Sequence, residues 1–386
     1  MKKKEKRQSV LNRFEKIGVI IIALILAILN YTYADNIYKR LFEMNPLLVS
    51  ALIIVFTCVS FLIFAFAHEI GHIVFGLLCG FKFISFRLGN IMLLKKNGRL
   101  TITKDSIPGT LGDCRMSPPE LVDGKMPVFW YFAGGVTFNL IFALIFSIPI
   151  ILRLDNPVFA MFCIVAILVN LLYAMLNLSP TATSLPSDGY HIKEIMDDKE
   201  NVRFIWLSMK ILEESHKGIR LSEMPDEWFE ISDGDAVDSL TFINYLATVC
   251  ERMCLQRRYD EAISVIDYAF NFNCKPIGLT ELSLAITRFH IAALEGDLEK
   301  AKNLFEQHML KYDKMMKNDA SYARVKYGYK LICKPTCSCA EKQKKHFLAM
   351  IEKMQKSVYS FMILDEQTLL DEMETAIKNT QAASNT

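Results

Sequence analysis

FLIFAFAHEIGHIVFGLLCG, residues 61–80, places three ionisable side chains in an otherwise apolar run. These are His68, Glu69 and His72. Histidines at positions i and i+4 share one face of a helix, so both imidazoles can bind one Zn²⁺. The glutamate between them is placed to take a proton from a water on that metal. For an isolated match of three fixed positions, a soluble helix with two surface histidines is the alternative.

The sequence before this motif indicates a membrane setting. Residues 47–67 carry no charge and are long enough to cross a bilayer. An ionisable side chain at membrane depth costs at least about 2.5–3.5 kcal/mol, so it is functional by default. Three polar side chains on one turn are hard to tolerate against lipid, whereas a protein interior with a bound metal accommodates them. We therefore expect an intramembrane zinc site.

Composition predicts a membrane part joined to a soluble part. The 386 residues are 52% hydrophobic, yet 22% are charged. A net charge of +2 argues against a nucleic-acid partner, which usually requires a strongly basic face. Cys333, Cys337 and Cys339, with His346, lack the paired spacing of a zinc ribbon. We expect reduced thiols there, and a second metal site is the alternative.

Four apolar segments predict four transmembrane helices, at residues 17–34, 47–80, 127–152 and 158–178. The first follows the basic start MKKKEKR and is interpreted as an uncleaved anchor, because no small-x-small cleavage site follows it; a cleaved signal peptide is the alternative. The loop at 81–125 is basic and therefore belongs inside. We expect an integral protein of the bacterial plasma membrane with both termini in the cytoplasm.

Residues 81–116 predict a membrane-associated β-hairpin or sheet. FKFISFRL is aromatic and β-branched, and IMLLKK and RLTITK flank Asn97-Gly98, the strongest short hairpin signal. An extended, glycine-containing segment, IPGTLGDCRMSPP, follows. Such a sheet is suited to pair with an unwound substrate as an added strand.

A catalytic zinc keeps three protein ligands and one open position, so a third ligand must come from elsewhere. The candidates on the same side of the membrane are Glu120, Asp123, Asp188 and His191. Asp188 is the best of them, because its Ser-Asp-Gly turn directly follows a membrane helix that can pack against the HEIGH helix. A solvated turn residue is the alternative for Asp188 taken alone.

Three signatures, in order, resemble the site-2 protease family, the intramembrane zinc metalloproteases, in its bacterial form. HEIGH is similar to the family's HExxH motif. Gly135-x-x-x-Asn139 is similar to its central-helix glycine–asparagine motif, and Asn177-x-x-Pro180 followed by Asp188-Gly189 is similar to its NxxP…DG motif. The resemblance covers about residues 47–192. The chain departs from the pattern in a longer gap before Asp188, in Tyr190 after the DG pair and in Val136 after the central glycine.

The resemblance implies a role for each matched residue. Zinc ligands are His68, His72 and Asp188, and Glu69 is the general base and acid. Residues Gly135, Asn139 and Asn177 are implied in holding an unwound substrate. Interhelical hydrogen bonding, worth about 0.6 kcal/mol on average, is the alternative for the two asparagines.

The chain after residue 192 is charged and helical in period. RRYDEAISVIDYAF (257–270) and GDLEKAKNLFEQHM (296–309) match at four positions, with Tyr259 and Ala262 equivalent to Leu298 and Ala301. This pattern resembles tetratricopeptide arrays at a spacing slightly longer than their period of about 34 residues, and an ordinary helical bundle is the alternative. Helical hairpin arrays usually bind peptides or partner proteins, so we expect recognition here and no chemistry.

Together these features predict a membrane α-helical fold with about four transmembrane helices and a small sheet, followed by an all-α helical-hairpin domain. The expected divisions are 1–46 (anchor and external loop), 47–191 (metalloprotease-like core) and 192–386 (cytoplasmic helical domain). The predicted function is a zinc-dependent intramembrane metalloendopeptidase that cleaves in or near the membrane segment of a protein or peptide precursor. The alternative is a membrane peptide-binding, maturation or immunity scaffold without turnover.

Overall fold

The computed structural model describes residues 43–384 except 97, 105–109, 154–155, 182–185, 232–236, 335–337, 356 and 358. Three of its helices are long and apolar enough to cross a membrane. They are α3 (Pro46–Leu78), α4 (Val128–Ile151) and α5 (Pro157–Leu178). The described residues therefore contain three candidate spans, fewer than the predicted four, and the expected first span at 17–34 lies outside them.

Local sequence fixes where two of these helices begin. The side chain of Asn45 accepts a hydrogen bond from the Leu47 amide at 2.9 Å, and Asn156 accepts one from Phe159 at 3.0 Å. A proline occupies the first turn in both cases, where its missing N–H costs nothing. From there the helices run on without a charged residue until His68 and Glu69 of α3.

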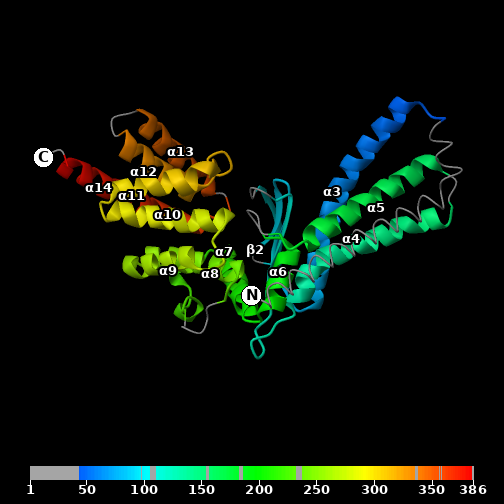
Figure 1. The fold of residues 1–386 in the computed structure, drawn as a ribbon, viewed down its shortest axis with the longest axis horizontal. Helices are drawn as coiled ribbons and strands as arrows, with labels where there is room; N and C mark the ends of the chain where they lie inside the picture. Colours follow the sequence, from blue (N-terminus) through cyan, green and yellow to red (C-terminus); the bar gives the residue numbers. More distant parts are fainter. Residues whose placement is uncertain are drawn as a thin grey trace.

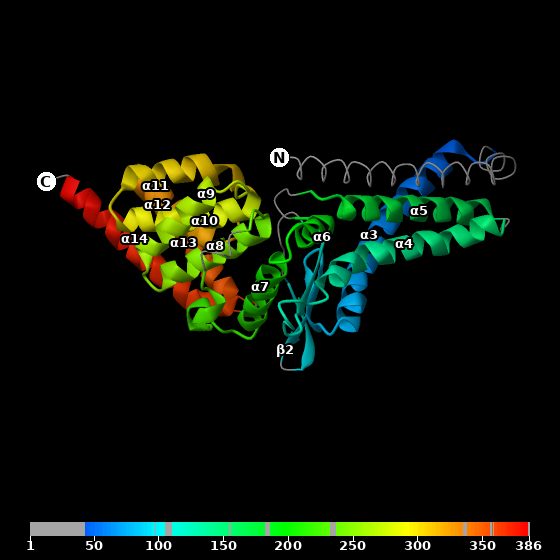
Figure 2. The ribbon, with the colours of Figure 1, turned by 60° about the horizontal axis from the view of Figure 1, so that its bottom comes forward.

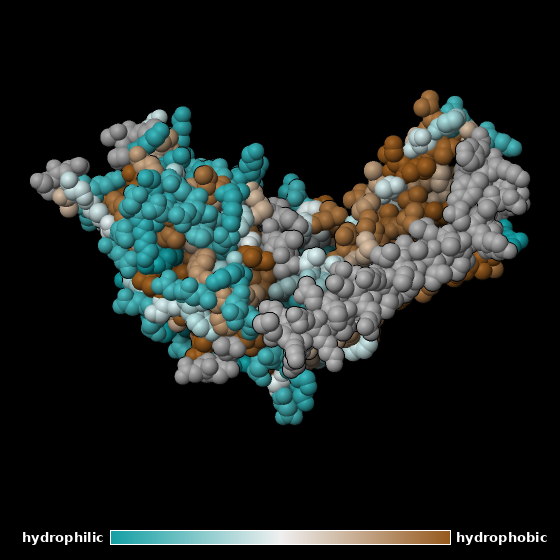
Figure 3. Space-filling model, in the orientation of Figure 1, coloured by the Kyte–Doolittle hydropathy of each residue, from teal (hydrophilic) through white to brown (hydrophobic). Residues whose placement is uncertain are grey.

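The three helices pack together as a bundle whose outer surface is apolar (Figures 1 and 3). Large hydrophobic side chains point outward along all three, among them Ile54, Leu144 and Leu176, which are 63%, 66% and 54% exposed. An exposed apolar surface of this extent is unfavourable in water and favourable in lipid. The bundle is thus built as a membrane part.

A four-stranded antiparallel sheet follows α3. Its strands are β1 (Lys82–Leu88), β2 (Ile91–Lys96), β3 (Arg99–Lys104) and β4 (Gly112–Ser117), in the order β3-β2-β1-β4. The β2–β3 hairpin closes at the pair Lys96 and Arg99, and Gly98 has the positive φ of +77° that such a turn requires. Asn97 lies outside the described residues. Strand β4 comes from the segment expected only to be extended, and it is an edge strand.

The rest of the chain is helical, as predicted. It comprises α6 (Asp188–Asp197), α7 (Asn201–His216), α8 (Leu240–Leu255), α9 (Tyr259–Asn271), α10 (Gly278–Leu294), α11 (Leu298–Leu304), α12 (Ala320–Cys333), α13 (Ser338–Met354) and α14 (Ile363–Ser384), with short 3-10 and π turns between them. Tyr259 and Leu298, equivalent in the two similar stretches, are the first residues of α9 and α11. Ala262 and Ala301 are both fully buried. Whether these hairpins form a true repeat array stays a prediction.

Helices α6 and α7 and the sheet lie between the membrane bundle and the remaining helices (Figures 1 and 2). Val202 and Ile205 of α7 share a hydrophobic cluster with Cys114 and Met116 of β4 and with Tyr131 of α4. Helix α6 runs across the boundary expected at 191–192. The helical part of the chain is therefore packed directly onto the end of the bundle where α3 ends and α4 begins.

Candidate metal centre

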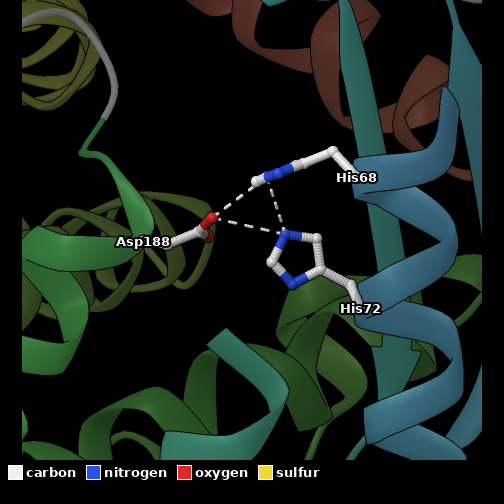
Figure 4. A group of neighbouring side chains, drawn as sticks. All are labelled: His68, His72 and Asp188. Carbon is white, nitrogen blue, oxygen red and sulfur yellow. Dashed lines mark hydrogen bonds and ion pairs between the residues drawn. The ribbon is translucent and has the colours of Figure 1, made fainter. Parts of the chain in front are cut away.

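Three side chains from two distant parts of the chain converge at this end of the bundle (Figure 4). His68 and His72 lie one turn apart on α3, and Asp188 is the first residue of α6. The Asp188 Oδ2 atom is 3.2 Å from His68 Nε2 and 3.3 Å from His72 Nε2, and the two Nε2 atoms are 3.2 Å apart. Among the described residues, this is the one group of His, Cys, Asp and Glu side chains placed to hold a metal ion.

The spacing of these three atoms fits a tetrahedral ion. Zn²⁺ binds nitrogen and oxygen at about 2.0–2.1 Å, and two ligands of a tetrahedral centre at that radius are about 3.3 Å apart. The three atoms form one triangular face of such a tetrahedron. A fourth position remains for water or substrate, as in catalytic zinc sites.

The other nitrogen of each imidazole explains why the converging atoms need a cation. His68 Nδ1 is 2.7 Å from Asn139 Oδ1, and His72 Nδ1 is 2.8 Å from the Tyr131 carbonyl. Both partners are acceptors, so each Nδ1 carries the proton and each neutral ring turns a lone pair outward at Nε2. Two such lone pairs and a carboxylate oxygen would repel one another without a metal ion between them.

Asn139 is held in the orientation that this bond requires. Its amide nitrogen donates to the Phe64 carbonyl at 3.3 Å and to Asn170 Oδ1 at 3.0 Å, so its oxygen is the atom left to face His68. Asn139 and Asn170 are fully buried between the membrane helices. Asn139 therefore fixes the orientation of the His68 ring, as the outer partners of metal-binding histidines do.

Helix α6 is positioned by the turn before it. Ser187 caps the helix by accepting from the Tyr190 amide at 3.2 Å, and its hydroxyl donates to the Ser179 carbonyl at 2.6 Å, which ties the turn to the end of α5. Gly189 is required here because a Cβ would lie 2.9 Å from the Leu178 Cα.

Glu69 lies between the two histidines and against strand β4. A Cβ added to Gly112 would lie 2.7 Å from Glu69 Cγ and 2.8 Å from Cδ, far inside normal contact distance. The backbone at Gly112 thus forms a wall beside the glutamate side chain. No local pattern predicts this contact, because Glu69 on α3 and Gly112 are distant in sequence and β4 is placed by its pairing with β1.

The other predicted site residues lie as follows. Gly135 is beside the metal ligands, since a Cβ there would be 2.5 Å from His68 Nε2 and 2.6 Å from His72 Nε2. Asn177 donates to the Tyr173 carbonyl of its own helix at 3.0 Å and does not reach the histidines. The substrate-holding roles implied for Gly135, Asn139 and Asn177 stay predictions.

The rival third ligands lie away from the cluster. The His191 ring stacks on Phe132 with centroids 4.6 Å apart, Glu120 pairs with Lys210 at 3.1 Å, and Asp123 occupies a left-handed turn with φ +51°. Cys333 is a free thiol, whereas Cys337 lies outside the described residues, so the alternative of a second metal site there stays open.

The chain was compared with family models, curated proteins and solved structures, and none of them matches. The chemistry of the site is therefore argued from its own residues.

Proposed function

We propose that this protein is an intramembrane zinc metalloendopeptidase. The observation that carries the proposal is the convergence of His68, His72 and Asp188 beside Glu69, at one end of a bundle of apolar helices. Helix α3 has 33 residues and is about 50 Å long, which exceeds the roughly 30 Å hydrocarbon core. The motif in its last turns therefore lies toward one membrane face.

Each residue has a role that follows from its surroundings. His68, His72 and Asp188 would hold Zn²⁺, which when bound acts as a Lewis acid and lowers the pKa of its water to about 7. Glu69 accepts the proton of the attacking water and later donates it to the leaving amine. Asn139 and the Tyr131 carbonyl keep the two imidazoles in the binding tautomer.

The substrate proposed is a peptide segment in or next to the membrane. A helical peptide bond is shielded by its own hydrogen bonds, so the segment must unwind, and unpaired backbone groups at membrane depth cost several kcal/mol. Strand β4 is an edge of the sheet and begins beside Glu69, which supports strand addition as the way to satisfy those groups.

Topology and the role of the helical domain belong to the same proposal. The basic loop at 81–125 favours the cytoplasmic side for the site and for both termini, in a bacterial plasma membrane. Because α6 carries both Asp188 and the first contacts to the later helices, the helical domain is well placed to present or screen substrate, or to dock a protein partner.

The test combines metal analysis with two substitutions in the purified full chain. We expect one zinc per chain and cleavage of a reconstituted transmembrane peptide. Glu69→Gln should abolish turnover and keep the metal, since Glu69 is no ligand, whereas Asp188→Ala should lose both. A wild-type protein that binds zinc but cleaves no membrane peptide would instead support the scaffold alternative. Full zinc content and activity in Asp188→Ala would rule out the third ligand.

A further inference from the structure

Arg87 on β1 is a buried cation that donates hydrogen bonds to Gly89 next to it and to Thr110 and Gly112 at the start of β4. It is 1% exposed, and within the described residues no carboxylate pairs with it and its Nε has no hydrogen-bond partner. An ionised group buried without a partner charge is costly unless hydrogen bonds satisfy its donors. The backbone groups that accept these hydrogen bonds therefore indicate the role of Arg87.

The guanidinium holds the start of β4. Nη1 donates to the Gly89 carbonyl at 2.9 Å and to the Thr110 carbonyl at 3.5 Å. Nη2 donates to the Thr110 hydroxyl and to the Gly112 carbonyl, the latter at 3.4 Å. The Gly89 amide adds a bond to the Leu111 carbonyl at 2.8 Å. Three successive carbonyls, at 110, 111 and 112, are thus held from the end of β1.

Gly112, the last of these three residues, is the one that contacts Glu69. The Gly112 backbone packs so closely against the Glu69 side chain that there is no space for a Cβ. A shift of this backbone by a fraction of an ångström therefore displaces the Glu69 side chain. Misplacement of a reacting group by about 1 Å costs about 100-fold in rate. We propose that Arg87 is a positioning residue, which fixes Thr110–Gly112 and thereby the orientation of the Glu69 carboxylate.

This inference rests on the proposed function, and its test uses two variants and two readouts. Arg87→Lys keeps the charge but loses the forked geometry. Gly112→Ala leaves the backbone angles unstrained and displaces Glu69 directly. On a reconstituted transmembrane peptide, each should lower kcat about 10–100-fold with KM and zinc content unchanged. The double variant should fall short of the product of the two losses, because both act through one contact.

The second readout does not depend on turnover. In Co²⁺-loaded protein, the visible absorption spectrum should shift in both variants, as it does in Glu69→Gln, at unchanged cobalt content. Arg99→Lys, an exposed arginine on strand β3 of the same sheet, is the matched control and should keep the wild-type kcat and spectrum.

The outcomes separate the two proposals. If the wild type cleaves and both variants keep its kcat and its cobalt spectrum, the positioning role is wrong. If Arg87→Lys loses metal and melting temperature together with kcat while Gly112→Ala is unaffected, Arg87 is only structural and the proposal is also wrong. If the wild type cleaves no membrane peptide, the proposed function fails, and the cobalt spectra alone decide whether Arg87 positions Glu69.

Discussion

At the scale of single residues, the proposed metal ligands follow from chemistry that is visible in the sequence. HEIGH predicts two ligands because helical spacing is local, and Asp188 was preferred among four candidates because it follows a membrane helix. The outer shell was harder to predict. Asn139 was assigned to substrate by resemblance, yet its oxygen faces His68. Only the crossing of α3 and α4 brings them together, and no local pattern encodes that.

Replacing Asn139 tests which of its two roles is real. Asn139→Ala removes the acceptor that holds the His68 tautomer, so zinc affinity should fall about 10–100-fold. Competition with a chromophoric chelator measures this. Asn177→Ala is the matched control, because within the described residues Asn177 bonds the Tyr173 carbonyl of its own helix and no histidine, and it should bind zinc normally. A normal zinc affinity with a raised KM in Asn139→Ala would instead favour substrate binding.

At the scale of elements, a close crossing of α3 and α4 sets the geometry of the site. A Cβ on Gly134 would lie 2.5 Å from the Gly71 carbonyl oxygen, and one on Gly71 would lie 2.9 Å from the Gly135 Cα. Small residues let helix backbones approach in this way. The crossing brings the Tyr131 carbonyl within reach of His72. The apolar runs in the sequence predict the helices. The sequence does not predict that these glycines lie at the helix crossing, which is visible only in the structure.

Gly71→Ala should push the two helices apart. Overpacking of this kind costs about 1–3 kcal/mol, so we expect a lower melting temperature and weaker zinc binding at unchanged helix content. Circular dichroism in detergent and the chelator assay measure these effects. Ser147→Ala, whose hydroxyl bonds only the Leu144 carbonyl of α4, should match the wild type. A Gly71→Ala protein with normal stability and zinc affinity would show that a Cβ at residue 71 fits between α3 and α4 without moving them.

A second element-scale contact joins α6 to α8. Glu194 of α6 is buried and accepts from the Leu240 amide at 2.6 Å, from the Thr241 amide at 3.3 Å and from the Thr241 hydroxyl at 2.5 Å. It thus caps the first turn of α8 from another helix. An anion at a helix N-terminus is favourable, and its loss leaves buried N–H groups unsatisfied.

Glu194→Ala should destabilise the junction by about 1–3 kcal/mol, the usual cost of stranding a buried donor. Hydrogen exchange should speed up in the first turn of α8 and spare the core of α12. Glu200→Ala, which removes an exposed acid near the same junction, should leave exchange unchanged. Unchanged protection of Leu240 and Thr241 in Glu194→Ala would mean that α8 does not depend on α6.

At the scale of the whole molecule, the division into a membrane part and a helical part was predictable, because hydropathy reports on solvent directly. The way in which the two parts pack together was not predictable. Helix α6 begins with the proposed metal ligand Asp188 and contacts α8 through Glu194, so the expected boundary at 191–192 falls inside one helix. A change in composition along the chain marks a change from lipid to water. The packing between the two parts depends instead on residues that are distant in sequence, such as Ser117, whose hydroxyl donates to Glu213 at 2.6 Å.

The helical part itself contains two hydrophobic cores with charged groups between them. One core includes α8 and α9, and the other includes α12, α13 and much of α14. Between them, Arg324 and Glu366 form a buried ion pair at 2.8 Å. Burial, and next the charge of Glu366, raise the pKa of Glu251 on α8 from 4.5 to about 7. Glu251 is therefore protonated in the folded protein at pH values where the unfolded chain has already released the proton.

The sign of the resulting pH dependence is fixed by that difference. Between about pH 4.5 and 7 the folded state binds more protons than the unfolded state, so stability falls as pH rises and the full penalty, at most about 3 kcal/mol, is present above pH 7. Glu251→Gln removes the titration. The variant should melt at a higher temperature than the wild type at pH 8 and at nearly the same temperature at pH 4.5. Exposed Glu227→Gln should change neither curve. If Glu251→Gln gains nothing at pH 8, the carboxyl ionises in the folded protein at little cost, and the charged layer between the two cores is open to water.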